Sequence, residues 1–207
     1  MTGGAKGASE AGRFSMTAAQ RMAVRRGSRG KRIAILAAIL MVVPVLGVLA
    51  FASTKPDNFH IERATAIKAP PERIFAAIDD FRAWQRWSPY ERLDPEMKRS
   101  LSGAASGKGA VYEWDGNGKV GAGRMEIAEA APPSRITINL DFTRPMESRN
   151  IVEFTLVPKG GATNVTWAMH GPSPYVTKVM TVFVDMDEMV GKDFESGLAN
   201  LKALVER

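Results

Sequence analysis

The sequence predicts an α+β fold in which a curved antiparallel sheet of six or seven strands wraps around a long C-terminal helix. Two observations support this prediction. Short segments with apolar residues at every second position follow one another over residues 97–170, separated by Gly- and Pro-rich turns. A pattern with three- and four-residue spacing then fills residues 186–205. The apolar face of the sheet needs a cover, and this last helix supplies one.

An apolar segment precedes the domain. Residues 33–52 form a run of twenty residues without a charge, and a helix of that length spans about 30 Å, the thickness of a bilayer's hydrocarbon core. The basic residues before it are Arg21, Arg25, Arg26, Arg29, Lys31 and Arg32. This bias favours a cytoplasmic N-terminus. We therefore expect a single-pass membrane protein whose C-terminal domain is extracytoplasmic, and periplasmic if the source is Gram-negative.

A cleavable signal peptide is the competing interpretation, because Ala50-Phe51-Ala52 has the small-x-small form that signal peptidase accepts. The apolar core of such a peptide is usually about 7 to 15 residues long. The longer run, preceded by 32 residues, favours an uncleaved anchor. Residues 1–32 are predicted to be a disordered cytoplasmic tail, because their first part is rich in Gly, Ala, Ser and Thr.

The net charge of +6 is concentrated in this tail. Residues 1–32 hold eight of the 28 basic residues and one of the 22 acidic residues, a net charge of +7. The remaining 20 basic and 21 acidic residues give the rest of the chain a net charge of −1. A domain without basic excess lacks the electrostatic footprint of a nucleic-acid-binding protein. Nucleic acid is therefore not an expected partner.

Residues 53–207 are enough for one domain with a single core. The chain has no cysteine, which excludes disulfides, thiol catalysis and thiolate metal sites. Residues 58–68 are the first predicted strand, with Phe59 and Ile61 on its apolar face. A helix is predicted to begin at Pro71, since proline suits the first helical position. A second short helix carries three aromatic residues at three-residue spacing, Phe81, Trp84 and Trp87.

Five further strands are predicted to form a meander of hairpins: Ala110–Asp115, Gly123–Ala130, Arg135–Phe142, Ser148–Val157 and Thr163–His170. Residues 116–121 satisfy the GxGxxG dinucleotide fingerprint, but a strand and not a helix follows them. They are therefore interpreted as a hairpin turn. In the C-terminal helix, Gly191 and Gly197 imply a close backbone approach or a break. We expect a kink or a helix start near Gly191. The apolar residues 175–187 before it are either a lid or a covering helix.

Four stretches of sequence resemble one known superfamily: residues 67–75 (IKAPPERIF), 80–89 (DFRAWQRWSP), 112–116 (YEWDG) and 193–198 (DFESGL). The chain is similar to the START-like helix-grip, or SRPBCC, superfamily over about residues 58–206, specifically to its polyketide cyclase/dehydrase and lipid-transport branch. The resemblance implies an apolar cavity between the sheet and the long helix, which accepts lipids, polyketides, hormones or other hydrophobic molecules. Fold alone does not decide the activity.

Aromatic and methionine side chains are the candidates for lining such a cavity, because adaptable Met and flat aromatic groups suit a mobile apolar ligand. The predicted ligand-binding residues are Trp84, Trp87, Tyr90, Trp114, Phe142, Trp167, Met169, Phe183, Met186 and Met189. Most of this set is also compatible with ordinary core packing.

The sequence has no nucleophile elbow. His60 and His170 have no second ligand nearby in the sequence, so no metal site is predicted, and no cofactor is indicated. Catalysis would have to be of the acid–base type. Ionisable residues within the apolar strands are Glu113, Arg124, Asp141, Arg149 and Glu153. Glu113 and Arg124 are the leading catalytic candidates, although the alternation does not decide which face of residues 110–115 is inward.

The leading hypothesis is a membrane-anchored domain, held by residues 33–52, that binds a hydrophobic small molecule or lipid without a chemical step. Two alternatives remain open. One is a cyclase or dehydratase that uses a cavity carboxylate such as Glu113 as the general acid or base. The other is a protein-interaction module with the same fold and no functional cavity.

Overall fold

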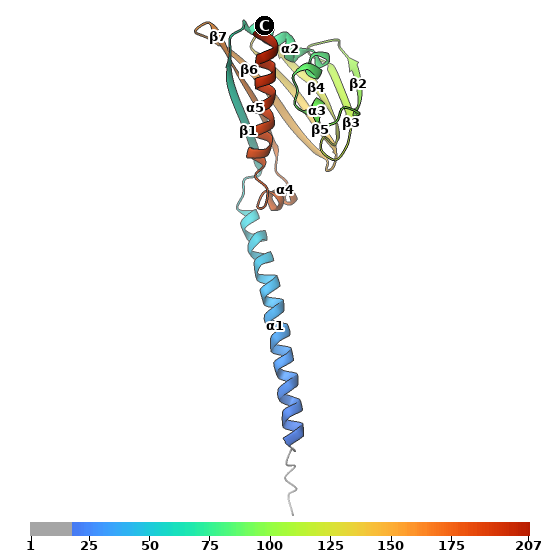
Figure 1. The fold of residues 1–207 in the computed structure, drawn as a ribbon, viewed down its shortest axis with the longest axis vertical. Helices are drawn as coiled ribbons and strands as arrows, with labels where there is room; N and C mark the ends of the chain where they lie inside the picture. The colour runs from blue at the N-terminus through green and yellow to red at the C-terminus, as the bar shows by residue number, and fades with distance from the viewer. Residues whose placement is uncertain (1–17) are drawn as a thin grey trace, which may run out of the picture. The chain divides into compact units, whose positions relative to one another are not determined.

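The computed structural model describes residues 18–207 (Figure 1). They divide into two compact units between Ala50 and Phe51, and each unit is described by itself. The first is formed by most of helix α1 (Ala18–Ser53), which contains Pro44. Within α1, Ile35–Ser53 is a helix of 19 residues, long and apolar enough to cross a membrane. Length and composition alone do not distinguish such a span from a signal sequence near the N-terminus.

Helix α1 begins earlier than the apolar run. The sequence predicted disorder for residues 1–32, whereas the structure describes residues 18–32 as helical; residues 1–17 lie outside the described part. The difference has a physical reason, because residues 18–26 are rich in Ala, Arg, Gln and Met, which favour helix. Once the apolar segment has nucleated a helix, each further residue adds a hydrogen bond without a new nucleation step.

The second unit contains one seven-stranded antiparallel sheet in the order β1-β7-β6-β5-β4-β3-β2. Its elements are β1 (Asn58–Ile67), α2 (Pro71–Asp79), the 3₁₀ helix η1 (Phe81–Arg86), α3 (Tyr90–Leu93), β2 (Lys98–Gly103), β3 (Ala110–Asp115), β4 (Ala122–Ala131), β5 (Arg135–Arg144), β6 (Ser148–Lys159), β7 (Ala162–Pro172), α4 (Tyr175–Met180) and α5 (Met186–Val205). The sheet curves around α5 (Figure 1). This confirms the predicted α+β fold and adds β2 as the seventh strand.

The register places one apolar layer on the concave face, against α5. Alternate residues of neighbouring strands form cross-strand rows, as in Arg63, Trp167, Phe154 and Ile136. The last three are buried with Ile138 in a single core cluster. Because the side chains of a strand alternate between the faces, the intervening residues point to the convex face.

Helix α5 is continuous from Met186 through Gly191, so the expected helix start near Gly191 is wrong. The alternative that the two glycines permit close approach is confirmed. A Cβ atom at Gly191 would overlap the guanidinium of Arg63, and one at Gly197 would lie 2.6 Å from the ring of Trp167. The glycines therefore bring α5 onto the sheet.

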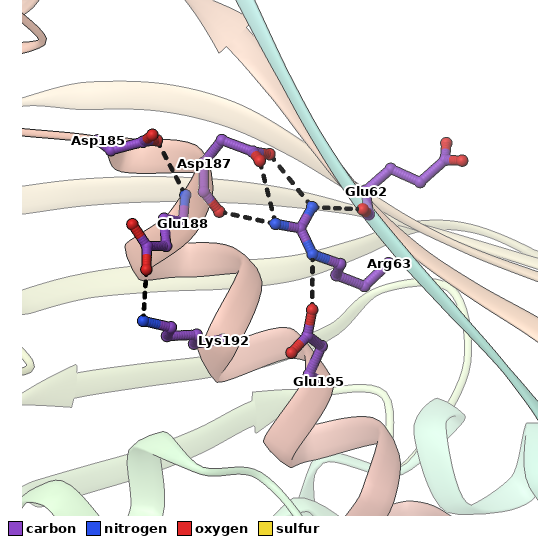
Figure 2. Close-up of polar contacts among 7 residues, drawn as sticks. All are labelled: Glu62, Arg63, Asp185, Asp187, Glu188, Lys192 and Glu195. Carbon is purple, nitrogen blue, oxygen red and sulfur yellow. Dashed lines mark hydrogen bonds and ion pairs between the residues drawn. The ribbon is translucent and has the colours of Figure 1, made fainter.

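A polar clasp holds the first turns of α5 to β1 (Figure 2). Arg63 donates to the Asp187 carboxylate at 3.0 Å, to the Glu195 carboxylate at 3.0 Å and to the Glu62 carbonyl at 2.8 Å. The carboxylate of Asp185 caps α5 by accepting from the backbone N–H of Glu188 at 3.0 Å. This clasp fixes the N-terminal end of α5 over the concave face.

Candidate functional site: an apolar rim on the concave face

Five aromatic side chains fill the space between the middle of α5 and the sheet. They are Trp84, Trp87, Phe154, Trp167 and Phe194, with ring centroids 4.2 to 6.4 Å apart. All five are buried. Offset, tilted and edge-to-face packing of this kind adds stability beyond the burial of area. We refer to these five residues as the aromatic core.

The indole N–H groups of the aromatic core are not all satisfied. Trp84 donates to the carbonyl of Ile78 at 2.8 Å, and Trp87 donates to the carbonyl of Ala77 at 3.0 Å. These two bonds tie η1 and the residue after it to α2. The Nε1 atom of Trp167 has no partner within residues 18–207.

Four apolar side chains on the same concave face are only half-buried. Phe59 on β1, Met125 on β4, Phe142 on β5 and Trp114 on β3 pack against the core cluster but keep some exposure. They lie toward the end of the sheet at which β1 begins and β7 ends, as the register shows. We call these four residues the apolar rim. An apolar surface that the domain itself leaves partly uncovered is a natural place for a hydrophobic partner.

The rim has a fixed shape on the side of β3 and β4. The rings of Trp114 and Phe142 meet edge to face with centroids 5.5 Å apart. Trp114 donates from Nε1 to the carbonyl of Val120 at 3.0 Å. A Cβ atom at Gly123 would lie 2.6 Å from the Trp114 ring, so this glycine allows the indole to lie flat on β4. The rim is therefore pre-organised rather than loose.

Asn150 places a buried polar atom on the concave face that carries the apolar rim. Its side chain faces the concave side, in register with Leu140, and is buried with 7% exposure. Nδ2 donates to the hydroxyl of Ser148 at 3.2 Å, while Oδ1 has no partner among the residues described. A flipped amide would exchange the two ends and still leave one polar end unsatisfied. Such a group costs about 1–3 kcal/mol of stability unless something pairs with it.

A carboxylate clamp supports the rim from α3. The two oxygens of Glu91 accept from the Tyr112 hydroxyl at 2.6 Å and from Nε of Arg99 at 2.7 Å. Burial, and then the bond to Glu91, raises the pKa of Tyr112. The clamp joins β2 and β3 to α3 and holds the strand that carries Trp114.

Burial raises the pKa of three other ionisable groups. Burial raises the pKa of Asp193 on α5. Burial, with a smaller contribution from Asp193, raises the pKa of Tyr90. Burial, followed by the charge of Asp80, raises the pKa of Asp79, whose Oδ1 has no partner in the described part of the chain. Of these groups, Asp193 belongs to the helix that covers the concave face.

The ten predicted ligand-binding residues fall into three environments. Trp84, Trp87 and Trp167 belong to the aromatic core, and Met169 is buried beside Ile61 and Val152 in the sheet. The half-buried residues of the set are Tyr90, Trp114, Phe142 and Met186. The structure places Phe183 and Met189 on the exposed surface, with 73% and 52% exposure. It therefore brings Trp114 and Phe142 together, with ring centroids 5.5 Å apart.

The two catalytic candidates lie on the convex face. Glu113, Arg124, Asp141 and Arg149 are successive register partners across β3 to β6, so they form one row of alternating charge. Glu113 is exposed, and Arg124 pairs with Glu126 at 2.7 Å. The acid–base role considered for Glu113 required a carboxylate facing the interior, and this position does not meet that requirement.

The two histidines are closer than their sequence separation indicated. His60 and His170 are register partners on β1 and β7, with ring centroids 6.2 Å apart, and His60 lies 3.2 Å from the Glu62 carboxylate. Within residues 18–207, no group of three or more His, Cys, Asp or Glu side chains is arranged to hold a metal ion.

Sequence reasoning missed Asn150 and Asp193. Asn150 is a buried polar member of an inward alternation that continues with Val152, Phe154 and Leu156. Asp193 lies three residues after Val190 and four before Gly197, so it shares their helix face. A polar residue at an inward position of an otherwise apolar pattern was the available signal in both cases.

Two surface hollows lie away from the rim. One, of about 140 Å³, is lined by residues of η1, β2 and β3, including Phe81, Arg82 and Leu101. The other, of about 510 Å³, lies between the β1–α2 turn and the β6–β7 hairpin, and its lining includes Lys68 and Lys159. Neither is lined by a predicted ligand-binding residue.

Comparison with known proteins identifies the fold. Protein CV1439 from Chromobacterium violaceum superposes with a TM-score of 0.52 at 20% identity, covering 74% of this chain and 99% of its own. The Aha1 dimer from Colwellia psychrerythraea gives 0.52 at 18% identity, covering 72% and 96%. Ginseng major latex-like protein 151 from Panax ginseng gives 0.51 at 15% identity, covering 73% and 100%. At these identities the likeness shows the fold alone.

No match to the chain was found among curated proteins. A family model described as polyketide cyclase / dehydrase and lipid transport matches residues 58–206, which is more than half of the chain. The matched region contains the whole sheet and α5. The chain therefore belongs to the polyketide cyclase/dehydrase and lipid-transport family of the START-like helix-grip superfamily.

Proposed function

We propose that residues 53–207 bind a hydrophobic small molecule or lipid at the apolar rim, and that residues 33–52 anchor this domain to a membrane. The observation that carries the binding proposal is the unpartnered, buried amide oxygen of Asn150 among apolar side chains of the concave face. Retaining an unsatisfied polar group in the free protein is costly, and a ligand that donates a hydrogen bond removes that cost.

The rim indicates the chemistry of the ligand. Phe59, Met125, Phe142 and Trp114 offer apolar and aromatic surface without a charge, which suits an alkyl chain or a fused-ring body. Asn150 adds one acceptor, which suits a hydroxyl or amide N–H on that body. The proposed ligand is therefore largely apolar, with a hydrogen-bond donor at one position.

The aromatic core limits where the ligand lies. Its five rings occupy the space under the middle of α5, so a ligand occupies the rim and not the depth of the domain. We propose binding without a chemical step, because the strand carboxylate considered for catalysis, Glu113, is exposed on the opposite face.

Membrane attachment is supported by the apolar helix Ile35–Ser53 and by the basic residues before residue 33. Large apolar side chains along this helix are exposed, with 77% exposure at Leu40. A helix that is apolar all round requires an apolar environment. The proposed organisation is a cytoplasmic tail at 1–32, a transmembrane helix at 33–52 and an extracytoplasmic binding domain at 53–207.

Photo-cross-linking tests the binding proposal. The full chain is reconstituted in phosphatidylcholine nanodiscs and illuminated with a long-chain alcohol that carries a diazirine, and the labelled peptides are identified by mass spectrometry. We expect labels within β3, β4 and β5, and loss of these labels in Met125→Arg. The control is Val157→Arg, an exposed position on β6. Labelling confined to residues 33–53, or unchanged in Met125→Arg, would contradict binding at the rim.

A further inference from the structure

The segment between β7 and α5 carries an exposed apolar surface. Its side chains Tyr175, Val176, Met180, Phe183 and Val184 are between 43% and 73% exposed. Val176 and Met180 are four residues apart on α4 and share a face. The turn after α4 is ordered by bonds from the N–H groups of Phe183 and Val184 to the carbonyl of Met180. We call these five residues the α4 patch.

Three contacts tie α4 and the residues on either side of it to the residues that follow the apolar helix. Lys178 pairs with the Asp57 carboxylate at 2.5 Å, and its own side chain is buried. Lys55 donates from Nζ to the carbonyl of Thr181 at 2.9 Å. The N–H of Ser173 donates to the carbonyl of Asp57 at 2.6 Å. All these residues belong to the same compact unit as Ser53, the last residue of the apolar helix.

Chain length then places α4 close to the end of the apolar helix. Four residues of extended chain span at most about 14 Å, so Asp57 lies within that distance of Ser53. Because Lys178 is in contact with Asp57, α4 is also held near Ser53. This proximity does not depend on how the apolar helix is oriented relative to the domain.

We infer that the α4 patch lies on the bilayer surface and forms a second, interfacial membrane contact of the domain. This inference rests on the proposed membrane anchor, because the span fixes where the bilayer ends. Apolar faces of interfacial elements bury about 5–10 Å into the boundary between headgroups and acyl chains. Tyrosine is enriched at this boundary because its ring is apolar and its hydroxyl is polar. The patch begins with Tyr175 and continues with aliphatic and aromatic side chains, which suits that environment.

Lipid contact also accounts for the exposure of the patch. Monomeric proteins seldom leave a contiguous apolar surface uncovered without a partner. Here the bilayer is the proposed partner, since residues 54–57 follow the span directly and contact α4 and its C-cap residue through Asp57 and Lys55. Phe183, predicted from the sequence to bind the ligand, is assigned to the membrane instead.

Site-specific fluorescence in the full chain tests this inference, because the chain has no native cysteine. Single variants Phe183→Cys and Val176→Cys carry an NBD label, and the protein is reconstituted in phosphatidylcholine vesicles with doxyl-labelled lipid. Both positions are exposed, so neither substitution disturbs the core. Leu40→Cys reports on the span, and Val157→Cys on β6 is the control.

We expect a blue shift of NBD emission and quenching by headgroup-proximal doxyl groups at positions 176 and 183, with neither effect at position 157. Quenching at position 40 without quenching at 176 and 183 overturns the inference and leaves the anchor intact. Equal quenching at 157 also overturns it, because the contact would then be non-specific. A label at position 40 that remains in water overturns the anchor, and the inference with it.

Discussion

Trp167 stacks on Phe194 with ring centroids 4.2 Å apart and an angle of 9° between the ring planes. The contact joins β7 to α5, and Gly197 permits it because any larger residue there would meet the same indole. Neither ring has appreciable exposure. The interior is therefore held shut by protein side chains at the position where the family resemblance implied a cavity.

The first prediction concerns this contact. Phe194→Ala removes the ring that covers Trp167, and truncation of a buried Phe costs about 3–5 kcal/mol of folding free energy. We expect a loss of this size in urea unfolding of the full chain in detergent, followed by tryptophan fluorescence. Met189→Ala on the exposed side of α5 is the matched control, and an equal loss in the control would contradict the assignment.

The second prediction concerns Asn150. Asn150→Leu removes a buried polar group that lacks a partner at Oδ1, so we expect the free energy of unfolding to stay unchanged or to rise by about 1 kcal/mol. We expect the same substitution to reduce the selectivity of ligand binding. The variant should lose the preference for a long-chain alcohol over its methyl ether, measured by competition in the cross-linking assay.

Asn139→Leu is the control for this variant, because Asn139 lies on the neighbouring strand β5 and is exposed. A stability loss in Asn150→Leu with unchanged selectivity would show that the amide is structural. That outcome would remove the main support for a ligand donor at the rim.

The fold was largely predictable because its signals are periodic. β3 has the predicted bounds, and β1, β4, β5, β6 and β7 lie within two residues of theirs. β2 was missed because its sequence, KRSLSG, has a single large apolar residue and no alternation. α3 was missed because four residues are too short for a helical pattern.

The site was predicted less well, for two physical reasons. Whether a cavity is open depends on side-chain volumes brought together from η1, β6, β7 and α5, and no local pattern encodes that sum. The orientation of β3 was ambiguous because each of its faces carries apolar residues: Tyr112 and Trp114 on one, Val111 on the other. In the structure, Tyr112 pairs with Met125 and Trp114 pairs with Gly123 across β3 and β4, so the face that carries Tyr112 and Trp114 is the concave one.

The third prediction follows from that orientation. Glu113→Gln changes one exposed residue of the convex charge row, so the free energy of unfolding should change by no more than about 0.5 kcal/mol. Cross-linking at the rim should also be unchanged, since the substitution is on the opposite face of the sheet. A variant that abolished labelling or a reaction would restore the catalytic alternative for this carboxylate.

The fourth prediction concerns two carboxylates of α5, Asp193 and Asp187, whose contributions to folding stability should change with pH in opposite directions. Burial raises the pKa of Asp193, so the folded state binds its proton more tightly than the unfolded state. This stability is fully present below the unfolded value of 3.8 and is lost as the pH rises through the folded pKa. Asp193→Asn is neutral at every pH, and we therefore expect it to be more stable than the native chain near neutral pH but not in acid.

Asp187 on the same helix provides the matched comparison. The hydrogen bond from Arg63 lowers the pKa of Asp187, so its contribution is present above the unfolded value of 3.8 and is lost as the pH falls through the folded pKa. Asp187→Asn should therefore be less stable than the native chain near neutral pH, with the difference fading in acid. Urea midpoints of both variants against pH measure this, and two curves of the same sign would contradict the opposite environments assigned to these carboxylates.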